Sequence, residues 1–124
     1  MNIRVLMLIF GSVALSAFAQ ILLKTGMSSE SIQRALGQLE TFSTVHVIAT
    51  NPWVIGGLIL YFLSAALWLL VLAKYDVSYA YPFVGLGFIF TLGLGWWLLQ
   101  EPVDFGRMVG TLFVAVGVYL VGRS

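Results

Sequence analysis

Four polar residues recur at every fourth position in the first apolar stretch of the sequence: Ser12, Ser16, Gln20 and Lys24. Residues four apart lie above one another on one face of an α-helix, so this spacing predicts a polar stripe that ends in a cation. Because polar groups are costly in an apolar environment, the stripe indicates one wall of a hydrophilic path whose lysine meets an anion. The alternative is that the serines pack against other helices and the lysine reaches to a polar boundary.

Later stretches hold further candidates for lining this path. Tyr61, Ser64 and Trp68 share a modestly polar helical face at spacings of three and four, which ordinary packing explains equally well. In the third stretch Tyr81 precedes Pro82, whose nitrogen has no hydrogen to donate, so the first helical turn is expected to loosen. Loosened backbone in an apolar environment should line a cavity or be covered by protein, which places Tyr81 to reach inward.

Charged residues and the composition narrow the chemistry. Glu101, at the end of the third stretch, can pair with Arg107 or meet a substrate cation. The sequence has no cysteine, one histidine, no Ser/His/Asp arrangement and a formal net charge of +1. We therefore expect no enzyme activity, no metal, no cofactor and no nucleic-acid partner. The apolar stretches also lack a central Asp or Glu, which proton-coupled transporters usually carry.

The elements that must position these residues are four apolar stretches, 3–24, 52–73, 79–99 and 105–121. Each is long enough to cross a hydrocarbon core of about 30 Å as a helix. Hydrophobic residues make up 60% of the 124-residue chain and charged residues 9%, which points to lipid as the solvent. The sequence thus predicts an all-α membrane protein with one four-helix domain over 1–124. Its second and third connections are short, so consecutive helices should be antiparallel neighbours.

Local signals mark the boundaries of these helices. Asn51 followed by Pro52 is typical of a helix N-terminus, and Asp76 and Asp104 can cap the third and fourth helices in the same way. Residues 17–19 resemble a signal-peptide cleavage site, but the apolar run continues beyond them, so we expect this stretch to be kept as a span.

The segment 28–51 is the only sizeable connection. Its apolar residues recur at helical spacing among charged and amide side chains: Ile32, Ala35, Leu36, Leu39 and Phe42. This pattern predicts a short amphipathic helix on the membrane surface, with a partly ordered loop as the alternative.

Glycines on the fourth stretch predict a packing surface. Gly106 and Gly110 are four residues apart, and Gly117 lies seven residues further on. Glycine lets helix backbones approach closely where lipid supplies no hydrophobic drive for association. Spacing does not decide whether the surface packs within the subunit or against a partner. Because four short helices enclose little volume, a path for a sizeable solute requires a second subunit, which favours a dimer.

Basic residues do not fix the orientation in the membrane. An even number of spans puts both termini on one side, and that side holds Arg4, Lys74 and Arg123. The other side holds Lys24, Arg34 and Arg107. Three against three gives the positive-inside rule little to act on, so cytoplasmic termini are favoured only slightly and insertion in both orientations is permitted.

Several motifs resemble those of a known superfamily: 67–72 (LWLLVL), 77–82 (VSYAYP), Glu101-Pro102-Val103 and Gly110. They resemble the drug/metabolite transporter superfamily, which includes EamA-type transporters and small multidrug resistance exporters. The likeness is greatest to the four-helix aminoarabinose–undecaprenyl-phosphate flippase subunits. This resemblance implies a multi-pass protein of the bacterial inner membrane that forms homodimers or heterodimers of four-helix subunits through the fourth helix.

The first helix separates two branches of this superfamily. Small multidrug exporters carry a membrane-embedded glutamate that exchanges protons for cationic drugs, and Ser16 stands at that position here. The flippase-like subunits carry a glutamine and a lysine where Gln20 and Lys24 stand. The resemblance therefore implies translocation of a polyprenyl-phosphate-linked sugar, such as an amino sugar, for envelope glycan or lipid A modification. An exporter of small cationic or metabolite solutes is the alternative, and a non-transporting subunit that stabilises a partner is the third hypothesis.

Each candidate residue then has an expected role. Lys24 and Arg107 would hold the phosphate, and Glu101 would meet an amino group on the sugar. The other candidates would line the sugar path: Ser16, Gln20, Tyr61, Trp68 and Tyr81. The polyprenyl tail would remain in lipid between helices.

Overall fold

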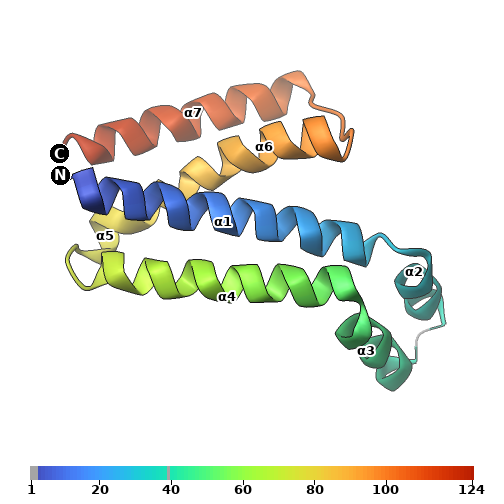
Figure 1. The fold of residues 1–124 in the computed structure, drawn as a ribbon. Coiled ribbons are helices and arrows are strands. Elements are labelled where there is room, and N and C mark those ends of the chain that lie inside the picture. The colour runs from blue at the N-terminus through green and yellow to red at the C-terminus, as the bar shows by residue number, and fades with distance from the viewer. Residues whose placement is uncertain (1–2, 39) are drawn as a thin grey trace.

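The computed structural model describes residues 3–38 and 40–124, which are mostly helical. Four helical spans are long and apolar enough to cross a membrane (Figure 1). They are α1 (Ile3–Met27), α4 (Pro52–Leu72), a third span made of α5 (Val77–Ala80), η1 (Tyr81–Gly85) and α6 (Leu86–Leu98), and α7 (Phe105–Gly122). The predicted all-α membrane fold is confirmed, and the treatment of the chain as one domain stays a prediction.

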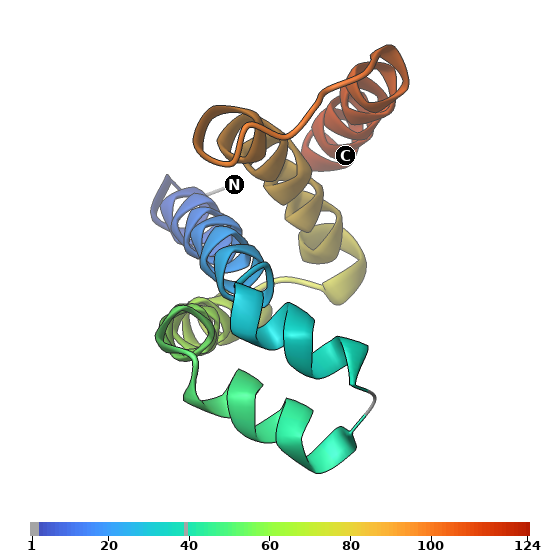
Figure 2. The same cartoon turned by 90° about the vertical axis from the view of Figure 1, so that its right-hand side faces the viewer.

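Helix α1 lies between α4 and the third span, so these two consecutive spans meet mainly near α5 and are not the side-by-side neighbours that the sequence predicted (Figure 2). Helix α1 runs antiparallel to α4, packs along it and also contacts α6 (Figures 1 and 2). Gly57 of α4 permits the close approach to α1, because a Cβ atom there would lie 2.8 Å from the Leu23 side chain and 3.1 Å from the Ala19 carbonyl oxygen. The polar stripe of α1 is therefore held next to two other spans.

The largest buried apolar cluster lies in the half of the bundle nearer the termini. It joins α1, α4, the third span and α7: Val5, Ile9, Val13, Val71, Ala80, Phe83 and Val118. Next to this core the Ser12 hydroxyl donates a hydrogen bond to the Ser64 carbonyl oxygen at 2.8 Å, and both serines are buried. This contact fixes α1 against α4, and the rest of the stripe continues from it toward the end of the bundle near α2 and α3 (Figure 1).

The third span changes helix type at Pro82. The sequence predicted a loosened turn there, whereas the backbone tightens into a 3₁₀-helix over Tyr81–Gly85 before α6 begins, because Pro82 has no N–H for an α-helical hydrogen bond. A Cβ atom on Gly85 would lie 2.8 Å from the Val114 side chain of α7, so glycine permits this contact between the two spans. The altered backbone is thus covered by protein on its α7 side.

The connection between α1 and α4 folds as two short helices, α2 (Glu30–Gly37) and α3 (Thr41–Thr50), where the sequence predicted one. Helix α2 ends at Gly37, a poor helix former, and the Thr44 hydroxyl then donates to the Ala35 carbonyl oxygen at 3.1 Å. Ile32 is fully buried, whereas Phe42 is 83% exposed. The predicted apolar face is therefore divided between an inward-packed helix and an outward-facing one, and Leu39 lies outside the described residues.

Two of the three predicted N-caps form. The Asn51 side-chain oxygen accepts from two backbone N–H groups of α4 at 2.9 and 3.2 Å, and the Asp104 carboxylate accepts from the Arg107 N–H at 2.8 Å. Asp76 stands at the N-cap position of α5 without a side-chain cap hydrogen bond, so that prediction was wrong. Its backbone carbonyl serves the four-residue helix instead, while the residue remains exposed.

Asn51, which caps α4, and Asp76, which makes no side-chain cap bond at α5, provide a matched test of the assigned cap. Asn51→Ala is expected to lower the free energy of unfolding by about 1 kcal/mol, because two helix N–H groups lose their acceptor. Asp76→Ala is expected to change it by less than about 0.5 kcal/mol. Reversible unfolding in mixed detergent micelles, followed by circular dichroism, measures both values. Equal losses from the two substitutions would contradict the assigned caps.

Candidate binding pocket

A pocket of about 450 Å³ lies among α1, α4 and α6, beside the connection between α6 and α7. Three stripe residues, Ser16, Gln20 and Lys24, line it from α1. Tyr61 lines it from α4, and Glu101 lines it from the connection after α6. The other lining residues are Ile21, Val84, Gly87, Phe88, Thr91 and Leu99. Candidate residues from separate segments of the sequence thus line one pocket.

A second pocket of about 190 Å³ adjoins the first and shares Ser16, Tyr61 and Val84 with it. The candidates Trp68 and Tyr81 line this second pocket, together with Ser12, Val13, Ser64 and Ala65. Because the Ser12 hydroxyl is used in the contact between α1 and α4, this serine serves helix packing. The stripe therefore has two parts: Ser12 fastens two helices, and the three residues after it line the larger pocket.

Helix α1 presents Lys24 from its last turns, at the end of the bundle near α2 and α3. The carbonyl end of a helix favours a cation there, because the backbone dipole leaves partial negative charge on the last turn. Lys24 is exposed, so its ammonium group keeps water while it lines the pocket. The pocket therefore has an accessible cation at this end of the bundle.

A tight turn directs Glu101 into the same pocket. Gln100 has a φ of 56°, a left-handed conformation that is uncommon outside glycine, and the Glu101 N–H then donates to the Gly95 carbonyl oxygen at 3.1 Å. The Glu101 carboxylate lies where a Cβ atom on residue 95 would be, so glycine at that position makes room for it. The carboxylate is folded back over the end of α6. It lines the same pocket as Lys24 and carries the opposite charge.

Lys24 and Glu101 line one pocket as separate charges. Among residues 3–38 and 40–124 the salt bridge that forms is between Arg34 and Glu30, one turn apart on α2 at 2.7 Å, and it involves neither Lys24 nor Glu101. A pocket with a cation, a carboxylate, the Gln20 amide and nearby hydroxyl groups suits a polar molecule that carries charges of both signs.

Arg107 takes a different position from the one expected. Its guanidinium donates to the Pro102 carbonyl oxygen at 2.8 Å, and in the described part of the chain it lines neither of the two pockets. The expected pairing with Glu101 is replaced by this backbone contact, because the turn at Gln100 points the carboxylate back toward α6. Arg107 instead holds the connection between α6 and α7 in shape.

Two residues that line the larger pocket from α6, Thr91 and Phe88, were not predicted from the sequence. The Thr91 hydroxyl donates to the Gly87 carbonyl oxygen at 2.8 Å, so it is held along its own helix. Thr91 lies four residues after Gly87 and three residues after Phe88, and this helical spacing was the available signal. It was weak because both neighbours are apolar and the helix is apolar on most of its surface.

This fold defines a small multi-pass membrane protein with a polar pocket among its spans. No protein-family model and no solved structure matches the chain. Curated relatives named as probable 4-amino-4-deoxy-L-arabinose-phosphoundecaprenol flippase subunits do match it. Subunit ArnE of Pseudomonas savastanoi is 35% identical over 88 residues, 71% of this chain and 77% of that protein. Subunit ArnF of Proteus mirabilis is 32% identical over 118 residues, 91% of this chain and 87% of that protein. Subunit ArnE of Pseudomonas syringae is 40% identical over 58 residues, 47% of this chain and 54% of that protein.

The chain belongs to the family of 4-amino-4-deoxy-L-arabinose-phosphoundecaprenol flippase subunits. This confirms the resemblance on which the sequence analysis relied, and the relatives are named as transport subunits and not as enzymes. The four apolar spans and the family together make the chain a multi-pass protein of the bacterial inner membrane. The word subunit in those names also implies a partner chain.

Proposed function

We propose that this chain is one subunit of a flippase that moves a polyprenyl-phosphate-linked amino sugar across the bacterial inner membrane, for lipid A or envelope glycan modification. The observation that carries the proposal is the pocket that Lys24 and Glu101 line together. The relatives' names describe a lipid with a phosphate and an amino group, one anion and one cation. A pocket with separate charges of opposite sign matches such a headgroup.

Each lining group has a role in this proposal. Lys24 binds the phosphate through a charge-assisted hydrogen bond, and Glu101 binds the sugar ammonium group. Gln20, Ser16 and Tyr61 accept from and donate to the sugar hydroxyls between the two charges. Trp68 and Tyr81 receive the sugar ring in the adjoining pocket, because aromatic faces pack well against apolar ring faces. Most of the polyprenyl tail stays among acyl chains, so the headgroup is the part that must be carried past the helices.

The partner in this proposal is a second four-helix chain, either a copy of this one or a related subunit, that packs on α7. A Cβ atom on Gly110 or Gly117 would meet no atom within 4 Å, so these glycines leave an open helix surface. Exposed apolar side chains lie on the same side of α7: Phe113 and Leu120. Gly106 begins the same surface. A second subunit would cover it and enclose a path wider than one pocket.

A cation exporter fits the pocket less well. Lys24 would repel a lipophilic cation, and Ser16 stands where an exporter needs a titratable group to exchange protons. The chemistry of the lining therefore favours an anionic headgroup over a quaternary ammonium compound.

Reconstituted vesicles test the proposed function. The chain, purified with its partner subunit, is expected to move polyprenyl-phosphate-linked amino sugar between leaflets and to leave a quaternary cation untransported. A chemical probe that reacts with amines only on the outer leaflet follows the movement. Gln20→Leu should slow translocation while the complex stays assembled. Full activity of Gln20→Leu would favour a subunit that only stabilises its partner, and cation uptake would favour an exporter.

Gly95→Ala tests the part of the proposal that concerns Glu101. The added methyl group must displace the flexible carboxylate, so the preference for the amino sugar over its N-acetylated analogue is expected to fall about fivefold, as for an exposed ion pair. Gly93→Ala is the matched control, since a Cβ atom there meets nothing within 4 Å. Translocation of the two lipids by each variant gives the ratio. An unchanged preference in Gly95→Ala would remove Glu101 from the site.

A further inference from the structure

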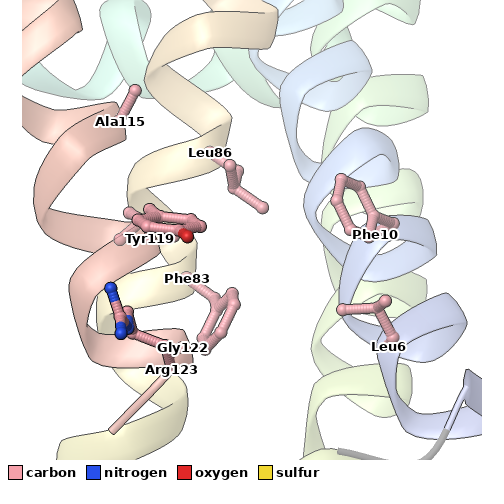
Figure 3. Close-up of a pocket in the computed structure, with 9 residues that line it drawn as sticks. Leu6, Phe10, Phe83, Leu86, Ala115, Tyr119, Gly122 and Arg123 are labelled. Atoms are coloured by element: carbon pink, nitrogen blue, oxygen red, sulfur yellow. The ribbon is translucent and has the colours of Figure 1, made fainter.

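A second large hollow lies at the other end of the bundle, between α1 on one side and η1, α6 and α7 on the other. Its volume is about 460 Å³. Figure 3 shows Leu6 and Phe10 of α1 facing Phe83 and Leu86 across it, with Tyr119 on α7 and Arg123 directly after that helix. All the walls are apolar except at the end of α7, where the guanidinium and phenol groups lie. We call this hollow the terminal groove.

The pocket that Lys24, Gln20 and Glu101 line is called the Lys24 pocket below. It and the terminal groove lie near opposite membrane faces. Leu6 in the groove and Lys24 in the pocket are eighteen residues apart on the same helix. At 1.5 Å per residue this separation is about 27 Å, close to the thickness of a hydrocarbon core of about 30 Å. Arg123 and Lys24 therefore place one cation near each face of the membrane.

Charge differs between the two faces. The face with the termini has three cations and one anion among its side chains: Arg4, Lys74, Arg123 and Asp76. The other face has three cations and four anions: Lys24, Arg34, Arg107, Glu30, Glu40, Glu101 and Asp104. An apolar groove that ends at an arginine, on the face with the positive balance, is complementary to a lipid with an anionic headgroup.

We propose that the terminal groove binds the carrier lipid polyprenyl phosphate, with the first isoprenoid units between α1 and α7 and the phosphate on Arg123. The inference rests on the proposed function and extends it to the second leaflet. A single groove with a single cation suits a lipid that has one chain and a bare phosphate, whereas bulk phospholipids carry two chains. In this proposal Arg123 supplies the phosphate contact in the leaflet that Lys24 does not reach.

Site-specific photocrosslinking tests this site separately from the Lys24 pocket. The full chain carries a diazirine-bearing residue at position 6 and is reconstituted with its partner subunit in phosphatidylcholine vesicles. These contain equal amounts of undecaprenyl phosphate and phosphatidylglycerol. Mass spectrometry of the crosslinked chain is expected to show undecaprenyl phosphate in excess. Arg123→Gln should lower that yield about fivefold, the effect of one basic residue near a charged lipid surface.

Matched variants define the site. Lys74→Gln removes a cation from the same face outside the groove and should leave the yield unchanged, as should Lys24→Gln at the other face. Ala115→Phe fills the groove and should abolish crosslinking, while Ala66→Phe on the exposed surface of α4 should not. Equal capture of phosphatidylglycerol, crosslinking to the partner subunit, or equal effects of Arg123→Gln and Lys74→Gln would each overturn the proposal. A loss of translocation in Lys24→Gln would still support the proposed function in those cases.

Discussion

Lys24→Gln is expected to lower the rate of amino sugar lipid translocation about 10- to 100-fold, while Lys24→Arg keeps most of it. The glutamine removes a charge-assisted hydrogen bond to phosphate, worth about 1.5–3 kcal/mol, and a factor of ten corresponds to about 1.4 kcal/mol. Arginine keeps the charge and can donate to two phosphate oxygens. The measurement is the initial rate of headgroup movement between leaflets in reconstituted vesicles at fixed salt concentration.

The control for this series is Lys74→Gln, which removes the same charge from the other membrane face, away from the Lys24 pocket. Its rate should remain within about twofold of the unmodified chain, as for a surface change away from a site. If Lys24→Gln and Lys74→Gln slowed translocation equally, the effect would come from overall charge or from expression. The assignment of Lys24 to the phosphate would then have no support.

Periodicity in the sequence predicted the α1 wall of the pocket because all its members belong to one helix. Ser16, Gln20 and Lys24 follow each other at one-turn spacing, so a regular helix is enough to align them. The sequence could not show that Ser12 would be used in a hydrogen bond to α4, because that requires the position of the Ser64 carbonyl group. The repeated spacing in the sequence thus predicted the polar stripe. Packing between helices decided that Ser12 binds α4 while the other three residues line the pocket.

Positions set by irregular backbone were harder to predict. Glu101 reaches the pocket because Gln100 adopts a left-handed conformation and Gly95 has no side chain to oppose the carboxylate. Neither condition follows from helical spacing, so pairing with Arg107 was an equally reasonable expectation. The segment 28–51 shows the same limit: its apolar period was visible, but Gly37 ended the first helix and divided the pattern between two.

Gly57→Val is expected to lower the free energy of unfolding by about 1–3 kcal/mol, because its side chain must enter the contact between α1 and α4. A Cβ atom at this position lies within 3.1 Å of both the Leu23 side chain and the Ala19 carbonyl oxygen. The carbonyl belongs to the helix backbone and cannot rotate away, so the two helices must separate. Because Lys24 follows Leu23 on α1, the wall of the pocket moves with them and translocation should fall as well.

The neighbouring glycine separates this effect from the general consequences of replacing glycine in a helix. A Cβ atom on Gly56 would lie 3.9 Å from the Leu22 side chain, an ordinary contact, so Gly56→Val should change the free energy of unfolding by less than about 0.5 kcal/mol. Reversible unfolding in mixed micelles gives both values, and vesicle translocation gives the functional result. Equal stability of the two variants would show that α1 and α4 do not approach so closely at this position. The close contact matters for function because α1 carries four of the lining residues and α4 carries Tyr61.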